Sequence, residues 1–246
     1  MTDPLRVVFL HGFAGVPEDW DAVRAALGGV DSLALALLGH GATDTTGSFE
    51  AEVDRVASRL ASGGPAHLVG YSLGGRVALG VLARHPALVS HATVVSASAG
   101  LSSDDERRAR VAADERWARL LEHDGVVPFL DAWDAQPLFA SRAKAGTERL
   151  AARRALRLAH DPRALARAMR VLGLGRMPCW LDALEAASVP VTFVAGGDDA
   201  RFVAAAERMA RRTPRAQLRI VERTGHDVPF ERPDVVAAII ATGESR

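Results

Sequence analysis

A serine between two glycines is the first candidate for chemistry in this chain. The pentapeptide Gly70-Tyr71-Ser72-Leu73-Gly74 follows the apolar run Ala66–Val69 and precedes a helical pattern of apolar residues. Glycines two residues before and two after the serine relieve crowding in a tight strand-to-helix turn, so that the hydroxyl of Ser72 projects into a cleft. The N-terminus of the next helix favours negative charge near that oxygen. The pattern predicts a serine that acts as nucleophile or base; the alternative is a glycine-rich turn with an incidental serine.

Such a serine needs a proton acceptor, and His226 is the best-placed candidate. An imidazole suits this role because its unperturbed pKa is about 6.5. Thr224-Gly225-His226 follows the last predicted strand, so the ring is expected on a loop at the carboxyl end of a strand. His40, in Gly39-His40-Gly41, is either structural or faces the substrate. Surface or packing positions are predicted for His67, His85, His91, His123 and His160.

The carboxylate that orients the imidazole should follow another strand. The run Val191–Ala195 leads into Gly196-Gly197-Asp198-Asp199. The usual position for this acid, three residues after Gly196, favours Asp199 over Asp198. Asp198 would then be a solvent-facing loop residue or a second carboxylate that helps to cap the next helix. The order serine, aspartate, histidine along the chain is that of one known type of catalytic triad.

Two backbone amides are candidates for an oxyanion hole. Leu10-His11-Gly12-Phe13 follows the first predicted strand, and this loop can supply the amide of Phe13. The second amide would come from Leu73, directly after the serine. Fixed donors of this kind stabilise an enolate as readily as a tetrahedral oxyanion.

Short apolar runs that alternate with helical patterns must position these loops. The predicted strands are Leu5–Leu10, Ser32–Leu37, Ala66–Tyr71, His91–Ser96, Pro190–Ala195 and Ala216–Val221. Strand alternating with helix indicates a parallel sheet with right-handed crossovers. Nearly continuous apolar strands indicate that both faces of the sheet are covered. We therefore predict an α/β fold with a mostly parallel, doubly wound sheet of about six strands.

The alternation stops between Ser96 and Pro190, where helical patterns rich in alanine, leucine and arginine predict an inserted cap. Its first helix should begin at the capping box of Ser103 and Glu106 and end at Gly125. Two or three further helices are expected before residue 188, with breaks at Pro128, Pro137, Gly146, Pro162 and the segment 173–178. The expected division is residues 1–98 and 189–246 for the core and 99–188 for the cap.

Composition excludes several classes of function. The 246 residues carry 30 basic and 30 acidic side chains, so nucleic acid is not an expected partner. Lys144 is the only lysine, and without a Gly-Lys-Ser/Thr sequence there is no phosphate-binding P-loop. Cys179 is the only cysteine, which rules out an internal disulfide or a cysteine zinc site. We expect no cofactor and no metal.

The apolar runs are too short for a signal peptide or a membrane span. We therefore expect no membrane partner and a cytoplasmic protein. The sequence leaves the oligomeric state open, a monomer included.

The motifs together resemble the α/β-hydrolases, and among them the 2-succinyl-6-hydroxy-2,4-cyclohexadiene-1-carboxylate (SHCHC) synthases of menaquinone biosynthesis. The likeness covers nearly the whole chain and is most specific in the predicted cap. It is carried by Leu10-His11-Gly12-Phe13, Val69 to Arg76, Glu106 through Arg110 to Trp117, Asp131-Ala132-Trp133-x-x-Gln136-Pro137-x-Phe139-Ala140-Ser141, Gly196 to Phe202, and Gly225-His226. The chain departs from the pattern at Leu38, where relatives commonly have proline.

The resemblance implies a role for each matching residue. It assigns Ser72, Asp199 and His226 to the triad, and the amides of Phe13 and Leu73 to the oxyanion hole. For the substrate it implies Tyr71, Arg76, Arg110, Trp133 and Arg154. The spacing supports two of these, because Arg76 lies one helical turn beyond Ser72, and Arg110 shares a helix face with Trp117. The alternatives are a solvated helix face for each arginine and packing in the cap for Trp133.

The implied reaction is a lyase reaction on a small polycarboxylate. SHCHC synthases eliminate pyruvate from 2-succinyl-5-enolpyruvyl-6-hydroxy-3-cyclohexene-1-carboxylate (SEPHCHC), which has three carboxylates. Guanidinium groups bind carboxylates in a planar, bidentate manner, which explains an expected set of arginines. The alternatives are a serine esterase, thioesterase or C–C bond hydrolase with the same triad, and a ligand receptor without catalysis.

Overall fold

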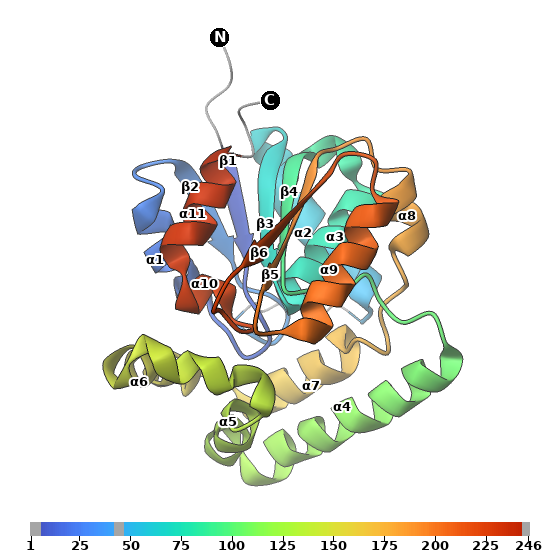
Figure 1. Cartoon of the computed structure of the whole chain (residues 1–246). Helices are drawn as coiled ribbons and strands as arrows, with labels where there is room; N and C mark the ends of the chain where they lie inside the picture. Colours follow the sequence, from blue (N-terminus) through green and yellow to red (C-terminus); the bar gives the residue numbers. More distant parts are fainter. Residues whose placement is uncertain (1–5, 42–46, 243–246) are drawn as a thin grey trace.

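The computed structural model describes residues 6–41 and 47–242, and it contains one sheet of six parallel strands (Figure 1). The spatial order is β2-β1-β3-β4-β5-β6. Every neighbouring pair is parallel. The strands are β1 (Arg6–Leu10), β2 (Asp31–Leu35), β3 (Ala66–Tyr71), β4 (Val89–Val95), β5 (Val191–Gly196) and β6 (Ala216–Val221). The predicted parallel, doubly wound sheet is confirmed.

Helices cover both faces of this sheet, which explains the continuous apolar strands. One face packs against α2 (Phe49–Leu60), α3 (Leu73–Arg84) and α9 (Ala200–Arg212). The other packs against α1 (Asp21–Ala26) and α11 (Pro233–Thr242). The remaining short helices of the core are η1 (Pro17–Trp20), η2 (Ala61–Gly63), η3 (Pro86–Leu88), α8 (Leu181–Glu185) and α10 (Val228–Glu231). The interior strands β3 and β5 are buried along their whole length.

The helical insertion lies across the carboxyl ends of the strands (Figure 1). It consists of α4 (Asp104–Asp124), α5 (Val126–Asp134), η4 (Pro137–Ala145), α6 (Thr147–Arg157) and α7 (Pro162–Leu172). We call these five elements the cap. The hydroxyl of Ser103 accepts a hydrogen bond from the Glu106 amide at the start of α4, and Gly125 ends the helix with a φ of +82°. Both ends of α4 therefore agree with the prediction.

Two details of the predicted insertion differ from the structure. Four helical segments follow α4 within the cap, more than the two or three expected. Pro128 does not break a helix, because it lies in the first turn of α5, where amides have no intrahelical acceptor.

Within the described ranges, none of the helices combines the length and the apolar character that crossing a bilayer requires.

Candidate active site

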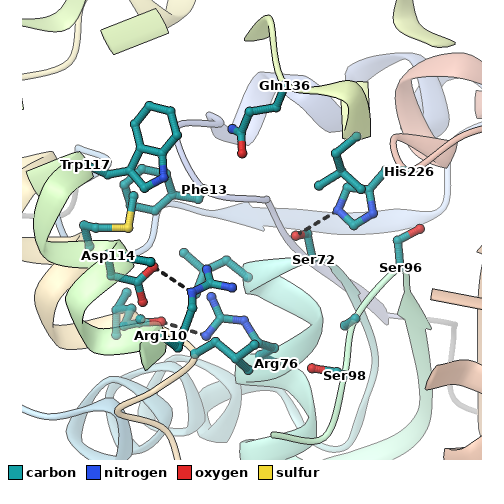
Figure 2. A pocket seen from close by; sticks show the side chains of 18 of the residues that line it. Phe13, Ser72, Arg76, Ser96, Ser98, Arg110, Asp114, Trp117, Gln136 and His226 are labelled. Carbon is teal, nitrogen blue, oxygen red and sulfur yellow. Dashed lines mark hydrogen bonds and ion pairs between the residues drawn. The ribbon is translucent and has the colours of Figure 1, made fainter. Parts of the chain in front are cut away.

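Ser72, His226 and Asp199 meet at the carboxyl edge of the sheet, although they come from three separate segments. His226 Nε2 lies 3.2 Å from Ser72 Oγ (Figure 2), and His226 Nδ1 lies 2.8 Å from Asp199 Oδ2. A carboxylate can only accept, so the proton of the neutral ring is on Nδ1. Nε2 is then free to accept the proton of the Ser72 hydroxyl. This is the geometry of a serine activated by general base.

The turn that carries Ser72 is strained and depends on its glycines. Ser72 has a φ of +50°, which residues with a side chain rarely adopt. A Cβ atom on Gly70 would lie 2.3 Å from the carbonyl oxygen of Gly74. On Gly74 it would lie 2.1 Å from the carbonyl oxygen of Leu10. Glycine at both positions is therefore needed for the close approach of β1, β3 and α3 that exposes the hydroxyl.

The two adjacent aspartates have different environments. Asp199 is almost buried, and besides contacting His226 it accepts a long hydrogen bond from the Phe202 amide (3.4 Å) at the start of α9. Asp198 is about half exposed and pairs with Lys144 at 3.0 Å. Of the two roles considered for Asp198, the structure therefore places it as a solvent-facing loop residue. The helix cap belongs to Asp199.

The amides of Phe13 and Leu73 lie on two loops that are joined to each other. Leu73 is the first residue of α3, so its amide has no acceptor within the helix. Next to it, the Gly74 amide donates to the carbonyl oxygen of His11 at 3.0 Å, which holds the loop after β1 against the serine turn. Both amides therefore remain candidates for an oxyanion hole beside Ser72.

A cavity of about 290 Å³ opens beside Ser72 and His226, between the core and the cap. Phe13 and Leu73 line it from the core. The charged groups in its wall are three arginines and one aspartate, namely Arg76, Arg110, Arg201 and Asp114. The lining therefore carries an excess of positive charge, which suits an anionic ligand.

Arg76 and Arg110 lie side by side in this cavity (Figure 2). Arg76 Nη1 donates to the Leu172 carbonyl oxygen at 2.7 Å, and Arg110 Nε donates to Asp114 Oδ1 at 2.7 Å. A guanidinium has five N–H donors, so each arginine retains donors for a ligand. Burial, and then the charge of Arg110, lower the pKa of Arg76 to about 9, with Asp114 opposing the shift. Arg76 is thus still a cation at neutral pH, and an anionic ligand would relieve its repulsion with Arg110.

Trp133 both packs within the cap and lines the cavity, so the two alternatives for it are not exclusive. Its ring stacks on Phe129 with centroids 5.4 Å apart, and it contacts Phe13 at 5.3 Å and Trp117 at 5.1 Å. Trp117 also faces the cavity, as does Arg110 seven residues earlier on α4. Phe13, Trp117 and Trp133 thus form an apolar part of the cavity wall, and Phe129 supports them from within the cap.

The structure does not bring Tyr71 into the cavity, contrary to the expectation. Successive residues of a strand face opposite sides, and Tyr71 packs with Phe9 and Trp20 in the cluster under α1 and α11. Burial, followed by the charge of Asp227, raises the pKa of the Tyr71 hydroxyl above its ordinary value. The Tyr71 ring also contacts the His226 ring, with centroids 5.5 Å apart, so it supports the position of the histidine.

Arg154 also lies outside this cavity, so the expectation that it joins Arg76 and Arg110 is corrected. Its guanidinium pairs with Asp131 at 2.7 Å and faces a separate hollow within the cap. The reason is the rotation of α6, whose buried face presents Arg153 and Arg157, one turn apart. Arg154 points about 100° away from Arg153 and about 60° away from Arg157, to one side of this buried face.

Ser96 is a cavity residue that the sequence reasoning missed. It directly follows β4, has a φ of +48°, and is 1% exposed. Ser96 lines the cavity, and its buried hydroxyl has no hydrogen-bond partner in the described part of the chain. Position at the carboxyl end of a parallel strand was the signal that could have identified it.

His40 and Leu38 have structural roles. His40 is 2% exposed and is absent from the cavity wall. The Leu38 amide donates to Glu52 Oε1 at 2.9 Å, a hydrogen bond that proline could not make. In the ranges 6–41 and 47–242, no three His, Cys, Asp or Glu side chains are grouped so as to hold a metal ion.

The fold and the site define the class of the protein. Residues 7–239 match the alpha/beta hydrolase family, and the chain belongs to it. The chain is similar to the SHCHC synthase of Enterobacter sp. (strain 638), with 33% identity over 241 residues, 96% of this chain and 90% of the relative.

Among solved structures, MenH from S. aureus superposes with a TM-score of 0.92 at 28% identity, covering 97% of this chain and 92% of that one. A thermophilic esterase from Thermogutta terrifontis, with malate bound, superposes with a TM-score of 0.82 at 25% identity over 97% of this chain and 88% of that one.

Proposed function

We propose that this protein is an SHCHC synthase, a carbon–oxygen lyase that eliminates pyruvate from SEPHCHC in menaquinone biosynthesis. The observation that carries the proposal is the presence of Arg76 and Arg110 in the same cavity as the Ser72–His226 pair. A hydrolase of neutral esters has no need of two guanidinium groups there, whereas a substrate with three carboxylates does. The similarity to proteins named as SHCHC synthases supports the same conclusion.

The reaction begins with removal of a proton from the carbon next to the succinyl ketone. His226, oriented by Asp199, takes the proton of the Ser72 hydroxyl, and the serine oxygen takes the proton of the substrate. The resulting enolate oxygen accepts hydrogen bonds from the Phe13 and Leu73 amides. No covalent acyl-enzyme forms.

Elimination follows through the ring alkene. The electron pair of the enolate moves through the ring, the C–O bond to the enolpyruvyl group breaks, and pyruvate leaves as its enolate. The proton held by His226 restores the charge balance when it passes to the departing enolate. Arg76 and Arg110 hold the carboxylates of the substrate throughout, in the part of the cavity beyond the serine.

The defining experiment gives the purified protein SEPHCHC, formed in situ by the enzyme that makes it, and follows pyruvate release beside ester hydrolysis. Wild-type protein should release pyruvate, and Ser72→Ala should not. Failure of the wild type to release pyruvate, with the preceding enzyme shown to be active, would refute the proposal.

A serine esterase, thioesterase or C–C bond hydrolase is the second candidate. It is favoured by the triad geometry and by the fold shared with the Thermogutta terrifontis esterase. A hydrolase of this kind forms an acyl-enzyme and gives a burst of product with activated esters. A burst without pyruvate release would select this candidate.

A further inference from the structure

Ala14, the residue after Phe13, has a backbone conformation that something else must hold in place. Its φ is +53°, in the left-handed region that residues with a Cβ atom avoid. It is fully buried and belongs to the apolar cluster of the cap, although it is part of a core loop. The peptide between Phe13 and Ala14 directly follows the amide expected to face the oxyanion. The geometry of Ala14 therefore affects the direction of that amide.

Both backbone polar groups of Ala14 are held by side chains from distant segments. Its amide donates to His40 Nε2 at 2.9 Å. Its carbonyl oxygen accepts from Arg157 Nε at 2.8 Å. His40 lies on the loop after β2, whereas Arg157 is the last residue of α6 in the cap. The oxyanion loop is thus fixed between the core and the cap.

His40 can accept from Ala14 because its other ring nitrogen is committed as a donor. Nδ1 lies 2.8 Å from the carbonyl oxygen of Leu38, so it carries the proton of the neutral ring and leaves Nε2 as an acceptor. Burial lowers the pKa of His40 well below its ordinary value, which keeps the ring neutral. The ring also packs against Phe13, with centroids 5.1 Å apart.

Arg157 is held in place by an ion pair within the cap. It is 3% exposed, and its Nη1 donates to both carboxylate oxygens of Asp134, at 2.9 and 2.8 Å. The planar guanidinium directs Nε at the Ala14 carbonyl while Nη1 faces Asp134. A lysine ammonium has no such fixed fork. It could therefore not make both contacts in the same geometry.

The same helix is anchored to the core next to the catalytic histidine. Arg153, one turn before Arg157, pairs with Asp19 and with Asp227, which follows His226. Burial alone would raise the pKa of Asp227, but Arg153 and Arg142 hold it below the ordinary value of an aspartate. The charges at this contact are therefore paired. α6 thus contacts the residue after Phe13 and the residue after His226.

We propose that Arg157 and His40 are positioning residues that direct the Phe13 amide, so that the oxyanion hole is complete only when α6 is packed on the core. The inference rests on the proposed function to the extent that it assigns the Phe13 amide to stabilising an enolate. It assigns to the cap a part in catalysis beyond binding the carboxylates. Figure 2 shows Phe13 between the cap side chains and Ser72.

The test uses Arg157→Lys, His40→Phe and His40→Gln. Two assays are used. Steady-state kinetics of pyruvate release give kcat and KM, and a second assay gives the rate at which a p-nitrophenyl alkylphosphonate modifies Ser72. The phosphonate requires the oxyanion hole but not the carboxylate site. Since loss of one oxyanion donor lowers kcat by about 100- to 1000-fold, a misdirected donor should lower kcat by roughly 10- to 100-fold with KM within about threefold. Phosphonylation should slow by a similar factor.

His40→Gln is the rescue variant, because its amide offers one donor and one acceptor in place of the two ring nitrogens. It should recover part of both rates that His40→Phe loses. His40→Phe preserves the ring packing, so it remains informative if Arg157→Lys does not fold. Circular dichroism and thermal melting of each variant establish that the rates are measured on folded protein.

Two control variants distinguish a misplaced Phe13 amide from a general loss of stability in the cap or the core. Arg170→Gln removes ion pairs with Glu115 and Glu122 on the cap surface. His67→Phe removes a buried histidine whose Nε2 partner is Thr93, away from the oxyanion loop. Both should keep kcat and the phosphonylation rate within about twofold of wild type even if they melt earlier. Equal losses in the controls, or wild-type rates in folded Arg157→Lys and His40→Phe, would overturn the inference.

The two readouts also separate this inference from the proposed function. If the wild type is phosphonylated at Ser72 but releases no pyruvate, the lyase assignment fails. The phosphonylation rates of the Arg157 and His40 variants then still show whether these residues direct the Phe13 amide. If the wild type reacts in neither assay, Ser72 is not activated and both proposals fail.

Discussion

His226 Nδ1 lies 2.8 Å from Asp199 Oδ2, whereas Asp198, the preceding residue, pairs with Lys144 at the surface. The two carboxylates are adjacent in sequence, yet only one is directed at the imidazole. Asp199 is also the N-cap residue of α9, so the orientation of the His226 ring depends on where that helix starts. This asymmetry makes the role of each aspartate testable.

Asp199→Asn should lower kcat for pyruvate release by about 1000- to 10,000-fold, because an amide in this place can impose the wrong tautomer on His226. Asp198→Asn should stay within about twofold of wild type, since an exposed ion pair contributes little. Steady-state kinetics on both variants check this. Similar losses in both would contradict the assignment of Asp199.

Arg76→Ala and Arg110→Ala should each lower kcat/KM for SEPHCHC by roughly 10- to 100-fold or more, on the scale of about 1.5 to 3 kcal/mol for a charge-assisted hydrogen bond. Lysine at either position should restore little, because it lacks the bidentate geometry. Arg154→Ala, outside the cavity, is the matched arginine variant and should keep wild-type kinetics. Wild-type rates in both cavity variants would refute the carboxylate-binding role.

The buried histidines should make the fold sensitive to acid. Burial lowers the pKa of His11 to about 4 and of His67 to about 3, and it lowers the pKa of His40 well below its ordinary value. In the unfolded chain these histidines have a pKa of about 6.5, so below that pH the unfolded chain binds more protons than the folded chain. The free energy of unfolding is therefore highest above that pH and decreases as the pH falls below it.

For three such groups, the free energy of unfolding should drop by up to about 4 kcal/mol between pH 7.5 and 5.5. Urea unfolding at the two pH values measures this difference. His67→Phe should remove about one third of the difference. An unfolding free energy that does not change between the two values would contradict the neutral, buried state of these rings.

Gly39 allows the cap to approach the loop after β2. It has a φ of +75°, and a Cβ atom there would lie 2.3 Å from the Ala164 carbonyl oxygen on α7. Gly39→Ala should cost about 2 to 4 kcal/mol, the sum of left-handed strain and a backbone clash. Gly28→Ala, with a φ of +67° but open space around it, should cost only about 1 to 2 kcal/mol. Equal losses in urea unfolding would show that α7 does not pack closely there.

Local patterns in the sequence account for those parts of the candidate site whose placement could be predicted. The strand, the two glycines and the helix around Ser72 lie within residues 66–84, so the steric demands of the turn can be read directly from the sequence. Likewise, Arg110 and Trp117 line the cavity together because seven residues return to the same helix face.

Contacts between distant segments account for the remainder. Arg157 meets Ala14 across 143 residues, and neither sequence neighbourhood indicates the other. The placement of Arg154 depends on the rotation of α6, which the adjacent arginines Arg153 and Arg154 leave undetermined in sequence. The resemblance to SHCHC synthases implied a substrate contact for Tyr71, but Tyr71 packs in the cluster under α1 and α11.

Pyruvate release by the purified protein is the most direct measure of the proposed lyase activity. SEPHCHC is formed in situ, and pyruvate is quantified for the wild type and for Ser72→Ala at matched concentrations. We predict that the wild type releases pyruvate rapidly and that Ser72→Ala does not. We also predict that the wild type gives no burst of product when it is supplied with an activated ester. Equal pyruvate release by Ser72→Ala, or none by the wild type, would contradict the account.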